Sequence, residues 1–247
     1  MFDHVTIRAS DRAASERFYD LVLATLEIEK SYADEGFAEW REFSLLETDP
    51  ARPDYPTTRR LHVAFVAPSR EHVDAFWRAG TAAGYRDDGA PGPRPQYRED
   101  YYGGFLLDPD GNSVEAVHHG GMPDDVIVDH LWLRVADVDR SRRFYALVAP
   151  HAGFEASSST DELAQFVRRP GRGSFSVVLG DRPTVGVHVA FPVDDDARIV
   201  AFHDELTAAG HASNGGPGER PEYHPGYVGA FVWDPDGTNV ELVNHHR

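Results

Sequence analysis

The spacing of apolar side chains changes along the chain between the period of a strand and that of a helix. Polar and apolar positions alternate over residues 4–8, which predicts a half-buried strand. Ser10 or Asp11 can cap the helix that should follow. One face of that helix is predicted to carry Phe18, Leu21 and Val22. Short strands are then expected at residues 26–32, 37–40 and 43–46.

The same order of elements starts again at residue 61. Residues 61–66 predict a strand, and residues 71–83 predict a helix that ends at Gly84. The Asp-Pro-Asp-Gly sequence at residues 108–111 is typical of a hairpin turn. Further strands are expected at residues 85–87, 103–107 and 114–117. The first half of the chain is therefore strand, helix and three strands, written twice.

The second half repeats the first at a constant offset of 126 residues, as in 130 − 4, 188 − 62 and 241 − 115. Chance does not hold one offset over many positions, so the chain is a duplicated module. We expect an α+β protein with one module at residues 1–120 and another at residues 126–247. The boundary falls in the Gly/Pro/Asp-rich residues 119–125. Four strand–helix–three-strand units should result, and we expect them to pair within each module.

Three polar residues of the first module lie on strand faces turned away from the helices. They are His4, His62 and Glu115; the histidines lie opposite the apolar residues of their strands, and Glu115 stands between apolar neighbours. Taken singly, each is explained by a partly exposed side chain. Two imidazoles and one carboxylate together, however, form a facial set that binds divalent Fe, Mn, Ni, Zn or Co. The second module offers the same set in His130, His188 and Glu241.

Composition narrows the choice of partner and of chemistry. The chain has 24 Lys and Arg against 41 Asp and Glu, a net charge of −17. A chain this acidic repels phosphates, so we expect no nucleic acid and no membrane as partner. The absence of Cys excludes disulfides and thiolate chemistry. We expect a cytoplasmic protein, monomeric or homodimeric, that binds a small molecule.

These residues resemble the vicinal oxygen chelate superfamily, which includes glyoxalase I, extradiol dioxygenases and bleomycin-resistance proteins. The resemblance rests on the first-strand His followed by Phe-Tyr, on the His-Val-Ala-Phe strand, and on Asp-Pro-Asp-Gly followed by Glu. It covers nearly the whole chain. It implies curved mixed sheets that enclose a cleft, and it places the family's metal ligands on the six residues given above.

The resemblance also suggests further site residues. Glyoxalase I has a fourth protein ligand, for which Glu42 or Glu47 are the candidates in the first module. His224 matches the histidine of the dioxygenase signature and is a candidate acid or base. Phe231 stands where that signature has Tyr, so Tyr227 and Tyr101 are the candidates for the missing hydroxyl.

Three functions remain open. The first is a metal-dependent lyase, isomerase or extradiol-type dioxygenase that acts on a small molecule with vicinal oxygens. The second is a metal-free binding protein that holds an aromatic or antibiotic ligand, for which Trp132 offers a stacking surface. The third is a regulatory or scaffold protein. The histidine pairs at residues 118–119 and 245–246 are candidates for an acid/base or fourth-ligand role, but we expect them to be frayed surface ends.

Overall fold

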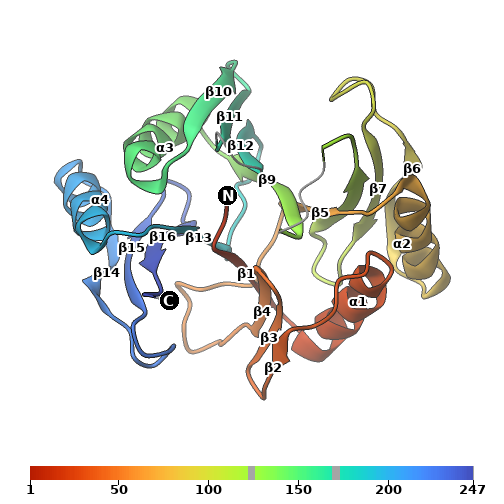
Figure 1. Ribbon diagram of the computed structural model, residues 1–247, viewed down its shortest axis with the longest axis horizontal. Helices are drawn as coiled ribbons and strands as arrows, with labels where there is room; N and C mark the ends of the chain where they lie inside the picture. The colour runs from red at the N-terminus through yellow and green to blue at the C-terminus, as the bar shows by residue number, and fades with distance from the viewer. Residues whose placement is uncertain (122–125, 169–172, 247) are drawn as a thin grey trace. The chain divides into compact units, whose positions relative to one another are not determined.

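The order strand, helix, three strands occurs four times in the computed structural model, which describes residues 1–121, 126–168 and 173–246 (Figure 1). The first occurrence comprises β1 (His4–Ala9), α1 (Arg12–Ala24), β2 (Tyr32–Ala33), β3 (Phe37–Trp40) and β4 (Phe43–Glu47). The second comprises β5 (Leu61–Val66), α2 (Arg70–Ala82), β6 (Arg86–Pro93), β7 (Tyr102–Leu107) and β8 (Ser113–His118).

The second half of the chain follows the same order. The third occurrence comprises β9 (Val128–Val135), α3 (Val138–Ala152), β10 (Glu155–Ser159), β11 (Leu163–Val167) and β12 (Ser174–Leu179). The fourth comprises β13 (His188–Pro192), α4 (Asp196–Ala208), β14 (Ser213–Glu219), β15 (Val228–Trp233) and β16 (Asn239–Asn244). The predicted linker lies in part at residues 122–125, outside the described residues.

Helix α1 shows why the repeated Phe-Tyr and Asp-Pro-Asp-Gly motifs occur together. Asp11 caps the helix by accepting the Ala14 N–H at 2.9 Å. Tyr19, fully buried, donates its hydroxyl to Asp108 Oδ2 of the hairpin turn at 3.0 Å. Tyr145 of α3 makes the same 3.0 Å bond to Asp234. In each module, the tyrosine of the helix and the first Asp of the turn therefore form a buried hydrogen bond, which explains why the two motifs occur together.

Two local predictions for the first unit are wrong. Leu21 is 37% exposed, and the buried face of α1 carries Phe18, Tyr19, Val22 and Leu23. No strand covers residues 26–31, where Leu26 and Ile28 are buried and Glu27 has a positive φ of 61°. The apolar residues of this segment pack as a turn, because burial of a short apolar run does not require a strand.

The strands form two eight-stranded mixed sheets. One has the order β14-β15-β16-β13-β1-β4-β3-β2, and the other has the order β10-β11-β12-β9-β5-β8-β7-β6. The prediction that units pair within each module is wrong, because β1 pairs with β13 and β5 pairs with β9. The copies carry the same pattern of polar and apolar residues, so that pattern cannot decide which copy a strand joins.

The chain divides into two compact units, and β1 and β9 each contribute residues to both. One unit contains Met1–Val5 and Leu133–Arg247, and the other contains Thr6–Trp132. Within the unit Thr6–Trp132, α1 packs against α2. Within the unit that contains Leu133–Arg247, α3 packs against α4. The short segment Met1–Val5 thus folds with the C-terminal half of the chain.

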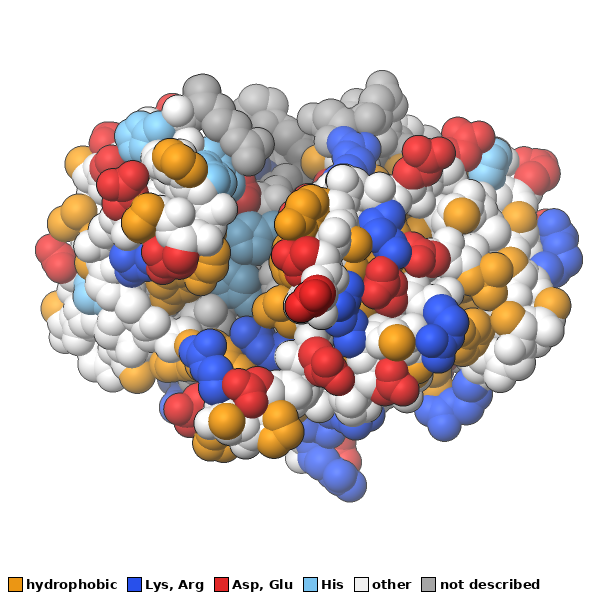
Figure 2. Space-filling model, turned by 90° about the horizontal axis from the view of Figure 1, so that it is seen from below, with side chains coloured by type: hydrophobic (Ala, Val, Ile, Leu, Met, Phe, Trp, Pro, Cys, Tyr) orange, Lys and Arg blue, Asp and Glu red, His pale blue; other side chains and the backbone are white. Residues whose placement is uncertain are grey.

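The surface matches the acidic composition. On the face in Figure 2, basic side chains are interspersed with acidic ones rather than gathered into one field. Among the described residues, the helices are too short or too polar to cross a bilayer.

Candidate metal centres

The parallel pairing of neighbouring strands places each Glu beside a His. In the β5–β8 pair Ala64 lies opposite Glu115, and His62 stands two positions before Ala64. In the β13–β16 pair Ala190 lies opposite Glu241, with His188 two positions before it. Residues two apart on a strand share a face, so each imidazole and carboxylate point to the same side of the sheet.

The first triad consists of His4, His188 and Glu241, all in one compact unit. The Nε2 atoms of His4 and His188 lie 3.0 Å apart. Glu241 Oε2 lies 3.0 Å from His188 Nε2 and 3.6 Å from His4 Nε2. Glu241 is fully buried, whereas His4 is half-buried, so the triad is reached from the side of His4.

The second triad repeats this geometry with His62, Glu115 and His130, all in the other compact unit. The Nε2 atoms of His62 and His130 lie 3.2 Å apart. Glu115 Oε2 lies 3.1 Å from His62 Nε2 and 3.6 Å from His130 Nε2. The six residues expected to be ligands thus form two groups of three, but His4 and His130 have exchanged partners relative to the prediction.

Hydrogen bonds on the far side of each ring aim the Nε2 lone pairs at the centre of the triad. His4 Nδ1 donates to Asp3 Oδ1 and His130 Nδ1 donates to Asp129 Oδ2, each at 2.8 Å. His188 Nδ1 contacts two atoms of Asn239, the side-chain Nδ2 at 2.8 Å and the backbone carbonyl oxygen at 3.1 Å, which hold the ring in place. Such outer partners fix the tautomer in which Nε2 is the metal-binding nitrogen.

His62 is held in the same way through a longer path. Its Nδ1 donates to Ser113 Oγ at 3.1 Å, and that hydroxyl donates to Asp88 Oδ2 at 2.7 Å. With Nδ1 of His62 and of His130 carrying the proton, the second triad brings together two nitrogen lone pairs and a carboxylate oxygen. Three acceptors this close repel one another unless a cation lies among them.

The donor spacing fits one divalent ion. Two ligands bonded to one ion at about 2.1 Å, with about 90–110° between the bonds, lie about 3.0–3.4 Å apart. The donor atoms of both triads are separated by 3.0–3.6 Å. The residues present therefore fit a metal held by two His and one Glu, with coordination positions left for a ligand.

Burial shifts the pKa of both carboxylates. It raises the pKa of Glu115 to about 7, although His130 opposes the rise, and it raises the pKa of Glu241 to about 7 against His4. Tyr101 donates its hydroxyl to Glu115 Oε1 at 2.8 Å, and Tyr227 donates to Glu241 Oε1 at 2.7 Å. Burial and the neighbouring carboxylate raise both tyrosine pKa values, so each hydroxyl remains a donor that orients its Glu.

Behind the first triad lies a chain of imidazoles. His245 Nε2 donates to Asp3 at 2.9 Å, and His245 Nδ1 lies 2.8 Å from His224 Nε2. The remaining His224 nitrogen donates to the Pro225 carbonyl at 2.8 Å. These contacts link His224 through His245 to Asp3, the aspartate that holds His4. Burial raises the pKa of Asp3, but the bonds from His245 and His4 outweigh it and hold that pKa well below its usual range.

The second triad has a guanidinium in the corresponding place. Arg98 Nη1 donates to His119 Nδ1 at 3.3 Å, and His119 Nε2 lies 3.5 Å from Asp129. The hydrogen bond to Asp129 raises the pKa of His119, against the effect of its burial. Arg98 also pairs with Asp100 at 2.7 Å. A permanent charge thus occupies in one centre the position that a titratable imidazole occupies in the other.

Several of these residues were missed or misread from the sequence. His119 and His245 are not frayed ends, because each lies against the aspartate that holds a ligand histidine. Asp3 and Asp129 immediately precede His4 and His130 and recur at the same offset of 126, a signal that could have identified them.

Two glycines leave room for the ligand carboxylates. A Cβ on Gly229 would approach Glu241 Oε1 to 2.5 Å, and one on Gly103 would collide with Glu115 Oε1. Gly103 and Gly229 are also 126 residues apart (229 − 103), so the repeat marks them as well.

The expected fourth ligand is absent from both triads as the structure describes them. Glu42 accepts the backbone N–H groups of Ile127 and Val128, the latter at 2.8 Å, so its carboxylate is committed elsewhere. Glu47 is the last residue of β4 and is exposed. Neither belongs to a cluster that could bind an ion.

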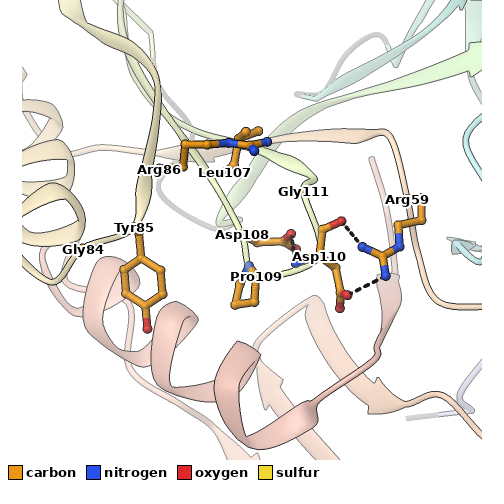
Figure 3. Close-up of a pocket in the computed structure, with 9 residues that line it drawn as sticks. All are labelled: Arg59, Gly84, Tyr85, Arg86, Leu107, Asp108, Pro109, Asp110 and Gly111. Carbon is orange, nitrogen blue, oxygen red and sulfur yellow. Dashed lines mark hydrogen bonds and ion pairs between the residues drawn. The ribbon is translucent and has the colours of Figure 1, made fainter.

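A separate open pocket lies at the hairpin turn of the first module (Figure 3). Asp108, Pro109 and Gly111 line it together with Arg59, whose guanidinium lies 3.1 Å from Asp110 Oδ1. Arg59 also donates to the backbone carbonyl of Asp110, and the figure draws both contacts as dashed lines. The pocket contains no triad residue, so we treat it as part of the scaffold.

Comparisons with known proteins agree with this fold. Glyoxalase I from Zea mays superposes with a TM-score of 0.70 and 19% identity, covering 99% of this chain and 92% of that one. A candidate dioxygenase from Bacillus subtilis superposes with a TM-score of 0.65 and 13% identity, covering 100% and 85%. Identities this low establish the fold alone. A search of curated proteins finds no match.

A family profile extends over both halves of the sequence. The profile of the Glyoxalase/Bleomycin resistance protein/Dioxygenase superfamily matches residues 1–116 and again residues 127–242. The resemblance seen in the motifs is thereby confirmed. The chain belongs to the Glyoxalase/Bleomycin resistance protein/Dioxygenase superfamily.

Proposed function

We propose that the protein is a metal-dependent enzyme that acts, as a lyase, isomerase or extradiol-type dioxygenase, on a small molecule with two adjacent oxygens. The observation that carries the proposal is the convergence of two imidazole nitrogens and one carboxylate oxygen, twice, with Nδ1 of His4, His62 and His130 bonded to acceptors behind the ring. A divalent ion bound there would polarise the substrate oxygens and stabilise an enolate or oxyanion.

The chain itself contributes orientation and exclusion of water. Asp3 and Asp129 hold the first-strand histidines, while Tyr101 and Tyr227 fix the carboxylates. The rings of Phe105 and Phe231, each 6.0 Å from a ligand histidine, provide an apolar side to each centre. Rigid ligands in a partly dry site favour bidentate chelation over loose binding of a single oxygen.

His224 is our candidate for the proton-transferring group of the first centre. It is half-buried, and its Nε2 lies 2.8 Å from His245 Nδ1. An imidazole that exchanges protons with solvent can act near neutral pH. Arg98, its counterpart by the repeat, cannot lose its proton. We therefore assign acid–base turnover to the triad of His4, His188 and Glu241.

The proposal is tested by metal content and by turnover. Protein purified without an affinity tag should contain about two transition-metal ions per chain by elemental analysis, one for each triad. A screen of α-hydroxycarbonyl, hemithioacetal and catechol compounds, with and without oxygen, should find turnover that a chelator abolishes and added metal restores. Metal-free protein that does not bind Zn, Mn, Fe, Co or Ni would contradict the proposal.

A metal-free binding protein is the second candidate. The aromatic residues beside the second triad favour it, because Trp132 is half-buried and Tyr97 is 52% exposed. Tight binding of an aromatic ligand by chelator-treated protein would support it. If the protein is instead a metal-dependent enzyme, binding of the aromatic ligand should require the metal.

A further inference from the structure

The two triads differ in what surrounds them, and that difference points to different ligands. Resting on the metal-dependent function above, we propose that the triad of His62, Glu115 and His130 takes a flat aromatic chelator. Trp132 provides the stacking surface. Thr6 is the counterpart of this tryptophan in the sequence repeat, and the triad of His4, His188 and Glu241 takes smaller, non-aromatic chelators.

Trp132 stands beside both imidazoles of its triad. Its ring centroid lies 5.3 Å from that of His62 and 6.2 Å from that of His130. It follows His130 by two positions on β9, so the two side chains share a face of the strand. A half-buried indole at this place presents its apolar surface next to the imidazoles that would hold the ion.

Tyr97 extends the same aromatic wall. Its ring lies 5.9 Å from Trp132 in an edge-on contact and 5.3 Å from Tyr101, which bonds the ligand Glu115. Tyr97 is 52% exposed, more than a residue that serves only to fill the core. The wall therefore runs continuously from the exposed loop to the metal ligands.

Features shared by both centres cannot produce this selectivity. Phe105 and Phe231 lie 6.0 Å from His62 and His188, and Arg94 and Arg220 cover these phenyl rings at 5.5 Å and 5.6 Å. The tryptophan is different, because Thr6 stands 126 residues before it and donates to or accepts from Ser44 at 2.7 Å. One substitution between the copies thus replaces a small polar group by a large planar one.

The test uses full-length chains with one triad disabled. His188→Ala leaves the Trp132 triad, and His62→Ala leaves the other. Each zinc-loaded chain is titrated by calorimetry with 4-nitrocatechol and with acetohydroxamate, two chelators that offer adjacent oxygens with and without an aromatic ring.

We expect a selective loss of aromatic binding. In the His188→Ala chain, Trp132→Thr should lower the affinity for 4-nitrocatechol about tenfold and change the affinity for acetohydroxamate by less than about twofold. Trp132→Phe should keep most of the affinity, because the planar surface remains. In the His62→Ala chain, Trp132→Thr should leave the affinity for both chelators unchanged.

The outcomes separate this inference from the proposed function. Equal loss for both chelators, or loss for neither, overturns the role of Trp132 while metal binding stands. If the His188→Ala chain binds no zinc, both proposals fail. Tyr97→Ala, made in the His188→Ala chain, provides a second measurement at an exposed position where folding is not at risk. It should lower the affinity for 4-nitrocatechol but not the affinity for acetohydroxamate. An unchanged affinity for 4-nitrocatechol would contradict the role of the aromatic wall.

Discussion

His4 and His188 are separated by 184 positions in the sequence, yet their Nε2 atoms lie 3.0 Å apart. Nothing local brings them together: β1 pairs with β13 of the second module rather than with β5 of its own. A metal ion bound by both would tie Met1–Val5 to the compact unit formed by the C-terminal half. An ion held by both histidines would therefore depend on the exchange of first strands.

Gly229, which lies beside the carboxylate of Glu241, allows a direct test of whether the position of that carboxylate controls metal binding. Gly229→Ala places a methyl group 2.5 Å from Glu241 Oε1, so the carboxylate must move. We expect metal affinity of that triad to fall by about 10–100-fold, the usual effect of displacing an outer partner of a ligand. Competition with a chromophoric chelator measures the affinity.

Gly216→Ala is the matched control, because no atom lies within 4 Å of the added methyl group. It should leave the affinity unchanged. Equal affinities for the two variants would show that the position of Glu241 does not depend on Gly229.

Replacing His224 by arginine gives the first centre the residue that the second centre has at this position, Arg98. Because Arg98 already donates to His119 in the repeat, His224→Arg should keep His245 and Asp3 in place and leave metal affinity within about twofold. Turnover that uses a proton from His224 should fall by about 100-fold or more. Steady-state kinetics and metal content, measured on the same preparation, separate the two effects. Unchanged turnover would remove His224 from the mechanism.

The buried turn aspartate predicts a pH dependence of stability. Burial raises the pKa of Asp234 to about 6, although the N–H groups of Thr238 and Asp236 oppose the rise. A carboxyl whose folded-state pKa exceeds its unfolded value favours the folded state when protonated. Its contribution is complete below about pH 4 and is lost as the pH rises through about 6, a change of about 3 kcal/mol.

Asp234→Asn removes this titration while it keeps an oxygen for the two backbone bonds. Urea unfolding at pH 4 to 7 should therefore show the free energy of unfolding of the variant rising relative to that of the parent as the pH increases. A difference between the two proteins that stays constant over this range would contradict the assignment.

The sequence predicts the elements well and their partners poorly. The strands at Phe37–Trp40 and Leu61–Val66 have the predicted bounds, because alternation and flanking turns define them locally. The six ligand candidates were found because polar residues repeat on apolar strands. Which histidine joins which glutamate depends on long-range strand pairing, and the two copies carry equivalent patterns there.

The outer partners were missed for another reason. Asp3 and His245 read singly as polar residues near chain ends, and only their contacts with His4 and with each other reveal a role. Trp132 was visible as a departure from the repeat, but its place beside His62 required the structure.

The exchange of partners between the modules is the central claim, and two double variants test it directly. His4→Ala with Glu241→Ala removes two ligands from one triad, whereas His4→Ala with Glu115→Ala removes one ligand from each. By elemental analysis, the first should retain about one metal ion per chain and the second about none. The reverse result, with metal retained by the second variant and lost by the first, would mean that the ligands pair within each module and would contradict the account.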